Sequence, residues 1–456
     1  MQTQAKKVHF IAIGGSVMHN LALELLSKGY QVSGSDDEIF EPAKSHLAAH
    51  NLLPEQLGWF PDKVTPDLEA VIVGMHAKAD NPELQKALSL NLRVYSFPEY
   101  IYQHCQNKHR IVIAGSHGKT TITAIIMHVL KVNKRKFDYV VGSKLEGFER
   151  TVSLNPKNPT IIIEGDEYPS SPLDKTPKFL HYKHHIAVIT GIAWDHYNVF
   201  PTFESYLKPF EDLVNQSEKG GFLIYSKDDK WATKLCTEKE IPDVMPIGYH
   251  VHNHKIVNGQ TILIAENGNK YPIQIFGEHN LRNISAAHIV CDKIGITEEE
   301  FYEALTTFKG AAQRLEKFAQ NEYSTFFRDF AHAPSKVQAT VKAVKTQFPK
   351  RKLVACLELH SYSSLNTQFI PQYKNTLKDA DVAIVYFNPK TLKNKNLHLT
   401  EDQVRQAFAY KNLIVMQDSQ ALWQWLQEQN WENKNLLLMS SGNFDNLNFE
   451  ELAKKL

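Results

Sequence analysis

An apolar run that leads straight into a glycine-rich loop constrains the fold of this chain more than any other stretch. Residues 113–121 read IAGSHGKTT and continue an apolar run that begins at Ile111. The run predicts a buried strand, and Gly-Lys-Thr-Thr predicts the first turn of a helix. The loop is shorter than the common Gly-x-x-x-x-Gly-Lys-Ser/Thr pattern, because Ile113 stands where that pattern has its first glycine.

The residue types of this loop suit a nucleotide phosphate. Unpaired N–H groups at a helix N-terminus attract anions, and Gly115 and Gly118 let the backbone come close to one. Lys119 can neutralise the β- and γ-phosphates, and the Thr120 hydroxyl can hold Mg²⁺. An ordinary strand-to-helix turn that contains a lysine is the weaker alternative. The predicted nucleotide-binding residues of the loop are Gly115, Ser116, His117, Gly118, Lys119, Thr120 and Thr121.

Apolar strand patterns alternate with helix patterns along the 456 residues. Such alternation is typical of parallel, doubly wound sheets. We expect three consecutive α/β domains: a Rossmann-like domain at 1–107, a P-loop ATPase-like domain at 108–312 and a Rossmann-like domain at 313–456. The polar residues 104–110 predict a linker, and less regular, antiparallel strands are expected between residues 220 and 276. The clearest strand patterns lie at 8–13, 31–36, 70–74, 160–168, 185–192, 352–359, 381–387 and 435–442.

Composition excludes several classes of protein. The chain has 51 Lys and Arg against 50 Asp and Glu, so a long-range field for nucleic acid or an anionic membrane is not expected. The four cysteines lie far apart without a C-x-x-C pair, which indicates free thiols in a reducing compartment. No signal peptide and no run of about 18 apolar residues is found. We expect a cytoplasmic protein, monomeric or weakly dimeric, that binds neither nucleic acid nor membrane.

Acidic side chains and a histidine follow two of the predicted strands. Glu164, Asp166 and Glu167 end one strand, and Asp195 and His196 come soon after the next. Ligands of open parallel sheets bind beyond the carboxyl ends of the strands, where a carboxylate can bind a hard cation. We therefore expect Glu164 and His196 at a metal site. Surface acids and a structural histidine are the alternatives.

Amide and guanidinium groups gather at the start of the next predicted helix and just after it. The sequence GEHNLRN offers His279, Asn280 and Asn283 at a helix start, and asparagine amides suit the edge of an adenine base. Capping explains one asparagine but not the cluster. Arg314 lies at a predicted domain junction, where an arginine can clamp a γ-phosphate when domains close.

A third polar cluster lies in the sequence FRDFAHAPS. Asp329 and His332 follow a predicted strand and precede a helix that starts near Pro334. This position at a strand end predicts a role at the site for both side chains. A capping aspartate is the alternative for Asp329.

The N-terminal stretch IAIGGSVMHN is a weaker signal. A strand runs into Gly14 and Gly15, and Asp36 ends the next strand, as in dinucleotide-binding folds. The G-x-G-x-x-G pattern is absent, because Ala12 replaces its first glycine and no third glycine follows. A nicotinamide dehydrogenase is therefore disfavoured, and a nucleotide diphosphate at this helix N-terminus is expected.

Taken in order, these motifs resemble those of the Mur ligases, the ATP-dependent amide-forming enzymes of peptidoglycan synthesis. The resemblance covers essentially the whole chain through AIGGSVM, GSD, GSHGKTT, EGDEY, WDH, GEHNLRN, QRLE and DFAHAPS. Three stretches, EGDEYPSSPLDKTPKFLHY, CLELHSYSS and LLLMSSGNF, are similar to those of the murein peptide ligases. Those enzymes join recycled L-Ala-γ-D-Glu-meso-diaminopimelate to UDP-N-acetylmuramate. The L-alanine-adding ligases of de novo synthesis remain the alternative within the family.

The resemblance implies roles for single residues. ATP and Mg²⁺ are the expected cofactors, with Lys119, His196 and Arg314 catalytic and Thr120, Glu164 and His196 at the metal. The remaining nucleotide contacts implied are His279, Asn280, Asn283, Arg314 and Asp329, and the substrate contacts are Gly14, Gly15, Ser16, Asp36, His332 and His360. A regulatory nucleotide-binding module is disfavoured, because a binder does not need two metal ligands.

The chain departs from the family pattern at several positions. Gly165 stands where relatives often have alanine, Ala333 where a second histidine is common, and His360 where many relatives have arginine. Many members carry a carbamylated lysine one helix after the Asp-His pair. Lys208 and Glu211 lie in that region, and we assign a carbamate to neither.

Overall fold

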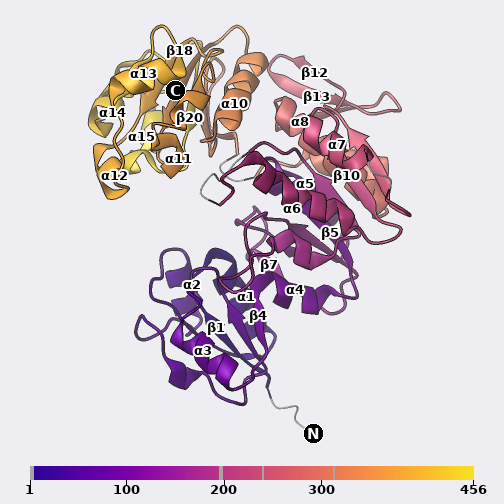
Figure 1. Ribbon diagram of the computed structural model, residues 1–456. Helices are drawn as coiled ribbons and strands as arrows, with labels where there is room; N and C mark the ends of the chain where they lie inside the picture. Colours follow the sequence, from indigo (N-terminus) through magenta and orange to yellow (C-terminus); the bar gives the residue numbers. More distant parts are fainter. Residues whose placement is uncertain (1–4, 195–198, 239–240, 312–313) are drawn as a thin grey trace. The chain divides into compact units, whose positions relative to one another are not determined.

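The computed structural model describes residues 5–194, 199–238, 241–311 and 314–456. Contacts between residues divide the chain into two units. Unit 1 consists of residues 1–250 and 286–300, and unit 2 of residues 251–285 and 301–456. Figure 1 gives the element labels for both units.

Unit 1 begins with a four-stranded parallel sheet in the order β2-β1-β3-β4. Alternate residues of β1 pack on opposite faces: Val8 and Phe10 join one apolar cluster, and Ile11 joins another. Both faces of the sheet are therefore covered, which is the usual condition of a parallel sheet. The elements are β1 (Lys7–Ile11), α1 (Ser16–Ser27), β2 (Gln31–Ser35), α2 (Ala43–Ala49), η1 (Pro61–Lys63), β3 (Ala70–Val73), α3 (Pro82–Ser89), β4 (Val94–Ser96) and α4 (Phe97–Cys105).

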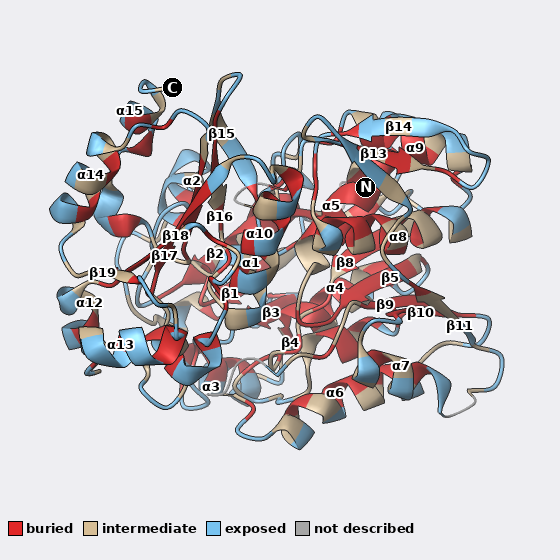
Figure 2. Cartoon of the chain, turned by 90° about the horizontal axis from the view of Figure 1, so that it is seen from above, coloured by how far each residue is buried: buried red, intermediate tan, exposed pale blue. Residues whose placement is uncertain are grey.

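A seven-stranded sheet follows in unit 1, in the order β11-β10-β9-β5-β8-β6-β7. All neighbouring strands are parallel except β6 and β7. The central strands β5, β8 and β9 are largely buried (Figure 2). Because β5 lies between β8 and β9, the segments that follow these three strands meet at one edge of the sheet.

The elements of this part are β5 (His109–Ala114), α5 (Lys119–Val132), β6 (Asp138–Val140), β7 (Val152–Ser153), β8 (Thr160–Glu164), η2 (Lys178–Tyr182), β9 (Ile186–Ile189), α6 (Phe203–Asn215), β10 (Phe222–Ser226), α7 (Lys230–Thr237) and β11 (Met245–Tyr249). Two helices, α8 (Glu278–Lys293) and α9 (Glu298–Thr306), run across the boundaries of the two units.

Unit 2 contains a three-stranded antiparallel sheet, β12-β13-β14, and a six-stranded sheet in the order β15-β16-β20-β17-β18-β19. In the larger sheet only β15 is antiparallel to its neighbour. Its elements, with those of the small sheet, are β12 (His254–Val257), β13 (Gln260–Ile264), β14 (Lys270–Ile273), β15 (Glu316–Gln320), β16 (Thr325–Asp329), α10 (Pro334–Gln347), β17 (Lys352–Glu358), α11 (Tyr362–Leu365), η3 (Ile370–Tyr373), β18 (Val382–Tyr386), α12 (Pro389–Asn394), α13 (Glu401–Phe408), β19 (Ile414–Met416), α14 (Ser419–Glu428), β20 (Lys434–Met439), η4 (Phe444–Asn446) and α15 (Phe449–Ala453).

The structure confirms the α/β class and each of the strands expected from the apolar runs, with ends that differ by a few residues. The expectation of antiparallel strands between residues 220 and 276 was wrong in part. In this stretch β10 and β11 are parallel members of the large sheet, and antiparallel pairing begins at β12. Among the described residues, no helix is both long and apolar enough to cross a membrane.

The polar segment 104–110 is not a free linker. It contributes the end of α4 and the start of β5. Lys108 is buried, donates to the carbonyls of Asn155 and Asn158 at 2.7 and 2.6 Å and pairs with Asp138. Arg110 is buried as well, and its side chain donates to five backbone carbonyls in this region. The charges that suggested a linker satisfy buried backbone groups instead.

Candidate active site

The glycine-rich loop connects β5 to α5 in the middle of the seven-stranded sheet. Gly118 is the N-cap residue of α5 with φ +83°, and Gly115 has φ +117°. A Cβ atom on Gly115 would lie 2.2 Å from Thr190 Oγ1, so a larger residue does not fit. The loop therefore needs its glycines, and it ends at the N-terminus of a 14-residue helix, where an anion is favoured.

Lys119 is paired with an acid from the segment after β8. Its Nζ donates to the Glu167 carboxylate at 2.9 Å and to the Gly115 carbonyl at 2.7 Å. The Glu167 side chain is only 1% exposed. Burial alone lowers the pKa of Lys119, but nearby carboxylates, Glu167 above all, outweigh burial and raise it above its usual value. Lys119 is therefore a fixed cation at the loop.

Thr120 and Glu164 bring two hard oxygen ligands together. The Thr120 hydroxyl donates to Glu164 Oε1 at 2.6 Å, and the Gly142 N–H donates to Oε2 at 2.9 Å. Burial and the charge of Asp166 raise the pKa of Glu164. A hydroxyl beside a carboxylate is a donor set that suits Mg²⁺, and a bound cation would favour the ionised carboxylate.

The sequence did not identify Tyr206 as a residue of this site, and it gave Glu167 no specific role there. The Tyr206 hydroxyl, from α6, lies 2.8 Å from Ser116 Oγ and 3.4 Å from Glu167 Oε1. Ser116 Oγ also donates to the Ala193 carbonyl at 2.8 Å. Glu167 is thus the buried link between Lys119 and Tyr206 rather than a loop-surface acid. No local pattern around Tyr206 marks it as part of the site.

Other predicted residues of unit 1 lie as follows. His117 is half-buried in the loop, and Thr121 is buried in the first turn of α5. His196, predicted as a metal ligand, lies outside the described residues. Lys208 is exposed and pairs with Asp212 at 2.7 Å on α6, so its ammonium is used on the surface.

The N-terminal loop is organised by Asp36. This carboxylate is 4% exposed and accepts the Gly14 N–H at 2.7 Å. Burial raises the pKa of Asp36, although this hydrogen bond opposes the rise. Gly15 is the N-cap residue of α1 and Ser16 its first residue. Asp36 therefore fixes the loop that leads into α1, and an anion is favoured at the N-terminus of such a helix.

The predicted adenine-contact cluster lies at the start of α8, in unit 2. Gly277 has φ +91°, and a Cβ there would lie 2.6 Å from Ala343 Cβ, so the helix is entered from a position that needs glycine. Asn280 and Asn283 are buried, and Asn280 Nδ2 donates to the Phe276 carbonyl at 2.9 Å. Asn280 therefore already has a backbone partner.

His279 adjoins a cavity in unit 2 of about 580 Å³ between the start of α8 and α10. Burial lowers the pKa of His279 to about 4, and the charge of Arg282 adds to this. The ring is thus neutral at physiological pH and can accept or donate a hydrogen bond.

Arg314 and Asp329 are neighbours at the start of the six-stranded sheet. The Arg314 guanidinium lies over the Phe330 ring, 4.9 Å from its centroid. Asp329 accepts the N–H groups of Leu315 at 2.6 Å and Ala331 at 2.5 Å, and burial raises its pKa to about 6. Asp329 thus holds the backbone on both sides of the strand pair. The capping alternative was wrong, because the N-cap residue of α10 is Ala333 and no side chain caps this helix.

His332 and His360 follow β16 and β17 at the same edge of that sheet. His332 Nδ1 lies 2.8 Å from the Phe330 carbonyl, and Tyr373 donates to the His332 carbonyl. His360 Nδ1 lies 3.8 Å from the buried Glu358 carboxylate. The structure brings His332, His360, Arg314 and Asp329 to one unit and the loop residues to the other.

Two family models match the chain. The Mur ligase family catalytic domain matches residues 7–109, and the Mur ligase middle domain matches residues 113–291. The UDP-N-acetylmuramate–L-alanine ligase of Aquifex aeolicus is 26% identical, covering 97% of this chain and 96% of its own. The UDP-N-acetylmuramate–L-alanyl-γ-D-glutamyl-meso-2,6-diaminoheptandioate ligase of Haemophilus influenzae is 24% identical, covering 98% and 99%.

Solved structures agree on the fold. A murein peptide ligase from Psychrobacter arcticus aligns with a TM-score of 0.64 and 21% identity over 99% of this chain and 98% of its own. A UDP-N-acetylmuramate–alanine ligase from Thermotoga maritima aligns with a TM-score of 0.70 and 20% identity, over 98% of this chain and 97% of its own. The MurF ligase of the same organism, in complex with ADP, aligns with a TM-score of 0.60 and 17% identity, over 85% of this chain and 89% of its own. Two Mur ligase models match successive parts of the chain, and relatives align with it from end to end. This chain therefore belongs to the Mur ligase family.

Proposed function

We propose that this chain joins the tripeptide L-Ala-γ-D-Glu-meso-diaminopimelate to UDP-N-acetylmuramate, with ATP and Mg²⁺, in peptidoglycan recycling. Membership of the family makes the chain an ATP-dependent ligase of peptidoglycan synthesis. The identity of the acceptor and the roles of single residues are the content of the proposal. The contact that carries the ligase assignment is the buried Lys119–Glu167 pair beside Thr120 and Glu164.

The residues of the loop fit ATP and Mg²⁺. Gly115 and Gly118 adopt positive φ, which glycine does readily, and the loop ends at the N-terminus of α5, where backbone N–H groups can face a phosphate. Thr120 and Glu164 offer a hydroxyl and a carboxylate, which suit a hard divalent cation. ATP supplies the phosphoryl group that turns an unreactive carboxylate into an acyl phosphate. Lys119 provides a positive charge where negative charge develops on the transferred phosphoryl group.

The proposed reaction has two steps that balance. The lactyl carboxylate oxygen of UDP-N-acetylmuramate forms a bond to the γ-phosphorus, and ADP leaves. The amine of the L-Ala residue, after losing a proton to the medium, then attacks the acyl carbon, and inorganic phosphate leaves with the C–O bond electrons. Arg314, whose guanidinium lies over the Phe330 ring, is proposed as a further cation that stabilises the transferred phosphoryl group.

The preference for a tripeptide is supported by the segment that follows β20. Phe444, Asp445 and Asn446 have φ of 50°, 55° and 61°, three successive left-handed residues without a glycine. Strained backbone of this kind persists where the surrounding structure over-determines it, and it often marks a functional site. We therefore interpret the sequence SSGNFDN as a segment that recognises the peptide substrate.

Asp445 provides the charge that a diamino acid requires. Its Oδ2 accepts Tyr386 Oη and Asn388 Nδ2, both at 2.5 Å, and these bonds leave Oδ1 unused. A carboxylate held in this way suits the distal ammonium of diaminopimelate. Free L-alanine has no second ammonium group and needs no such partner.

The alternative acceptor is L-alanine, which the names of several relatives favour, including that of Aquifex aeolicus. Phosphate release from ATP with UDP-N-acetylmuramate, measured with the tripeptide and with L-alanine, separates the two. We expect release with the tripeptide and background release with L-alanine. The opposite pattern would reject the recycling ligase and leave an ATP-dependent ligase of de novo synthesis.

A variant sharpens this test. Asp445→Asn should raise KM for the tripeptide about 10-fold or more, since a charged hydrogen bond contributes about 1.5 to 3 kcal/mol. The matched acceptor L-Ala-γ-D-Glu, which lacks the diamino acid, should react equally well with the variant and the parent. Equal KM values for the tripeptide would remove Asp445 from substrate recognition.

A further inference from the structure

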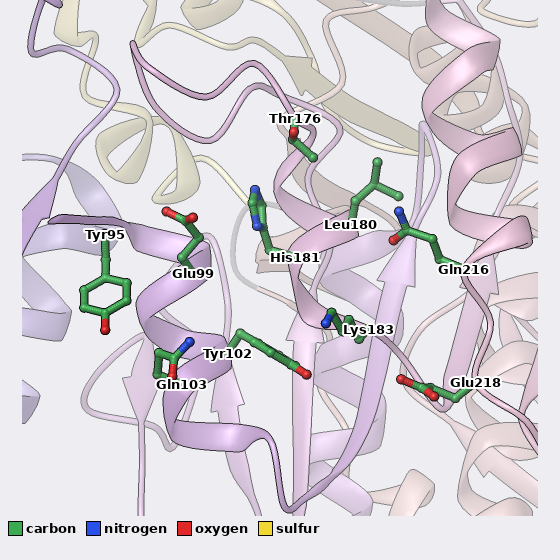
Figure 3. A pocket seen from close by; sticks show the side chains of 10 residues that line it. All are labelled: Tyr95, Glu99, Tyr102, Gln103, Thr176, Leu180, His181, Lys183, Gln216 and Glu218. Carbon is green, nitrogen blue, oxygen red and sulfur yellow. The ribbon is translucent and has the colours of Figure 1, made fainter. Parts of the chain in front are cut away.

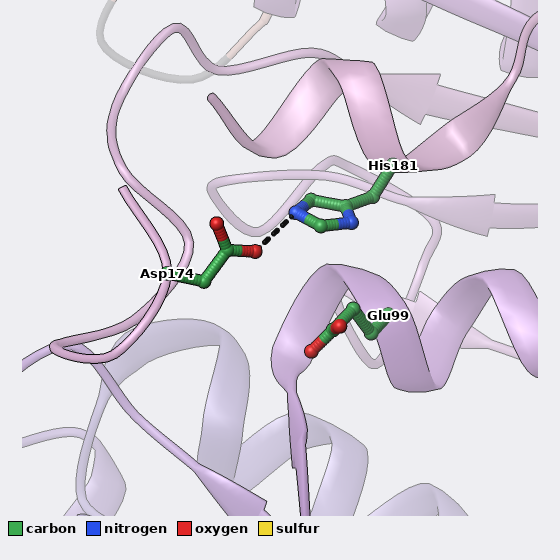
Figure 4. Close-up of side chains that lie close together, drawn as sticks. All are labelled: Glu99, Asp174 and His181. Atoms are coloured by element: carbon green, nitrogen blue, oxygen red, sulfur yellow. Dashed lines mark ion pairs between the residues drawn. The ribbon is translucent and has the colours of Figure 1, made fainter. Parts of the chain in front are cut away.

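Three metal-binding side chains meet in unit 1, away from the glycine-rich loop. Glu99 comes from α4, Asp174 from the segment between β8 and η2, and His181 from η2. One ligand atom from each lies within 4.8 Å of the other two. Figure 4 shows the three side chains directed toward one another. They are all half-buried rather than spread on an open surface.

Asp174 and His181 are in direct contact. Asp174 Oδ2 lies 2.8 Å from His181 Nε2, as an ion pair (Figure 4). An imidazole nitrogen and a carboxylate oxygen this close need only a small shift to bind one cation between them.

Each carboxylate is pre-oriented by bonds that use one of its oxygens. Glu99 Oε2 accepts both the Ser96 N–H and its Oγ–H at 2.7 Å, in a capping box at the start of α4. Asp174 Oδ1 accepts the Thr176 N–H at 2.9 Å. These bonds leave Glu99 Oε1 and Asp174 Oδ2 for a cation, and fixed ligands bind metals more tightly than mobile ones.

Two carboxylates and one imidazole thus meet in this cluster. This donor set suits a divalent transition-metal ion.

A cavity of about 520 Å³ adjoins the cluster (Figure 3). Glu99 and His181 line it together with Tyr95, Tyr102 and Lys183. The Lys183 ammonium lies over the Tyr102 ring, 5.0 Å from its centroid. The cavity leaves room for water on the open side of a three-ligand metal, as in sites that keep an exchangeable position.

We propose that Glu99, Asp174 and His181 form a site for a divalent transition-metal ion such as Zn²⁺, Mn²⁺ or Co²⁺. Two carboxylates and one imidazole are typical ligands of these ions, whereas Mg²⁺ prefers oxygen ligands and water. The ion ties α4 to the segment after β8, whose first residues include Asp166 and Glu167. The site is separate from the Mg²⁺ site of the proposed function and does not rest on it.

The test is Co²⁺ binding to the full, metal-stripped chain without nucleotide, followed by equilibrium dialysis and by the visible absorption of Co²⁺. We expect one Co²⁺ per chain with the absorption of an imidazole-ligated ion, retained in a large excess of Mg²⁺. His181→Gln and Asp174→Asn should weaken binding about 100-fold. Glu99→Gln should weaken it too while α4 stays folded, because glutamine also completes a capping box.

Two controls separate this site from others. Asp228→Asn alters an exposed aspartate–histidine pair, Asp228 with His250 at 3.1 Å, and it should leave Co²⁺ binding unchanged. Among the described residues, this pair belongs to no group of three metal-binding side chains. Glu164→Gln removes the proposed Mg²⁺ ligand and should also leave it unchanged. The proposal is overturned if the parent chain binds no Co²⁺, if Mg²⁺ displaces it, or if His181→Gln and Glu99→Gln bind as the parent does.

Discussion

Lys119 and Glu167 form an ion pair of 2.9 Å whose carboxylate is almost completely withdrawn from solvent. The lysine stands at the first position of α5, and the glutamate follows the neighbouring strand β8. Such a pair holds the ammonium group in place before a phosphate arrives. It also makes each partner dependent on the other, because an unpaired buried charge is costly.

The first prediction concerns Lys119→Ala. We expect phosphate release in the ligase assay to fall about 10³-fold, since a fixed cation at the transferred phosphoryl group is lost. We also expect the free energy of unfolding to fall by about 3 kcal/mol, because Glu167 is left buried without its partner. Activity and urea unfolding measured on the same preparation check both effects.

The double variant Lys119→Met, Glu167→Gln separates these two effects. Removing both charges should restore most of the lost stability, since no unpaired charge remains. The ligase activity should stay at the level of Lys119→Ala. Recovery of activity together with stability would mean that the lysine acts only by holding the fold.

The second prediction concerns Glu164, which accepts the Thr120 hydroxyl at 2.6 Å. Glu164→Gln should raise the Mg²⁺ concentration for half-maximal activity about 10- to 100-fold, because a carboxylate ligand is replaced by a neutral amide. Mg²⁺ titration of phosphate release measures this. Glu69→Gln, which removes an exposed carboxylate paired with Lys6, is the control and should titrate as the parent does. An unchanged Mg²⁺ dependence of Glu164→Gln would remove this residue from the metal site.

Much of unit 1 could be predicted from the sequence because its signals are local. Apolar runs that end at glycine define β5, β8 and β9, and Gly-Lys-Thr marks the start of α5. The partner of Lys119 could not be predicted in this way. Three acids follow one strand closely, and only the pairing of β5 with β8 decides that Glu164 meets Thr120 while Glu167 meets Lys119.

Non-local packing explains the other differences. Tyr206 reaches Ser116 from a helix 90 residues further along the chain, and no pattern around it marks the contact. Strand β11 lies at one edge of the sheet and has only one fully buried residue, so its sequence lacks the apolar run of a central strand. The sequence allowed Asp329 either a role at the site or a role as a helix cap. Only the structure shows that its two oxygens accept the N–H groups of Leu315 and Ala331.

The third prediction concerns Gly115→Ala. Its Cβ would lie 2.2 Å from Thr190 Oγ1 at a φ of +117°, so the loop must move. We expect a loss of about 3 kcal/mol in the free energy of unfolding, and loss of ATP binding, because clash and backbone strain add. Gly220→Ala is the matched control, with φ +75° and nothing within 4 Å of the added Cβ.

The free energy of unfolding of Gly220→Ala should fall by only about 1 kcal/mol, the cost of an alanine in the left-handed region, and this variant should bind ATP normally. Urea unfolding and isothermal titration with a non-hydrolysable ATP analogue measure both variants. Equal losses in the two variants would show that the Gly115 position has no special steric requirement.

The last prediction concerns the stability of unit 1 in acid. His184 is 1% exposed, its Nε2 lies 3.0 Å from Ser217 Oγ, and burial lowers its pKa to about 3 from an ordinary value of 6.5. The nearby charges of His185 and Arg110 add to this shift. Because the folded pKa is depressed, the folded state favours the neutral ring. The neutral His184 ring makes its full contribution to the free energy of unfolding above pH 6.5. This contribution is lost as the pH falls from 6.5 toward 3.

Between pH 6.5 and 4.5 this group alone should remove about 2.5 kcal/mol from the free energy of unfolding, at 1.36 kcal/mol per pH unit below the unfolded pKa. His184→Gln cannot take up a proton and can keep a bond to Ser217, so its stability should fall less steeply over the same range, from a lower starting value. Urea unfolding of both proteins at intervals of half a pH unit compares the slopes. Parallel curves would mean that His184 takes up its proton without unfolding the chain, and the acid sensitivity of this unit would then belong to other groups.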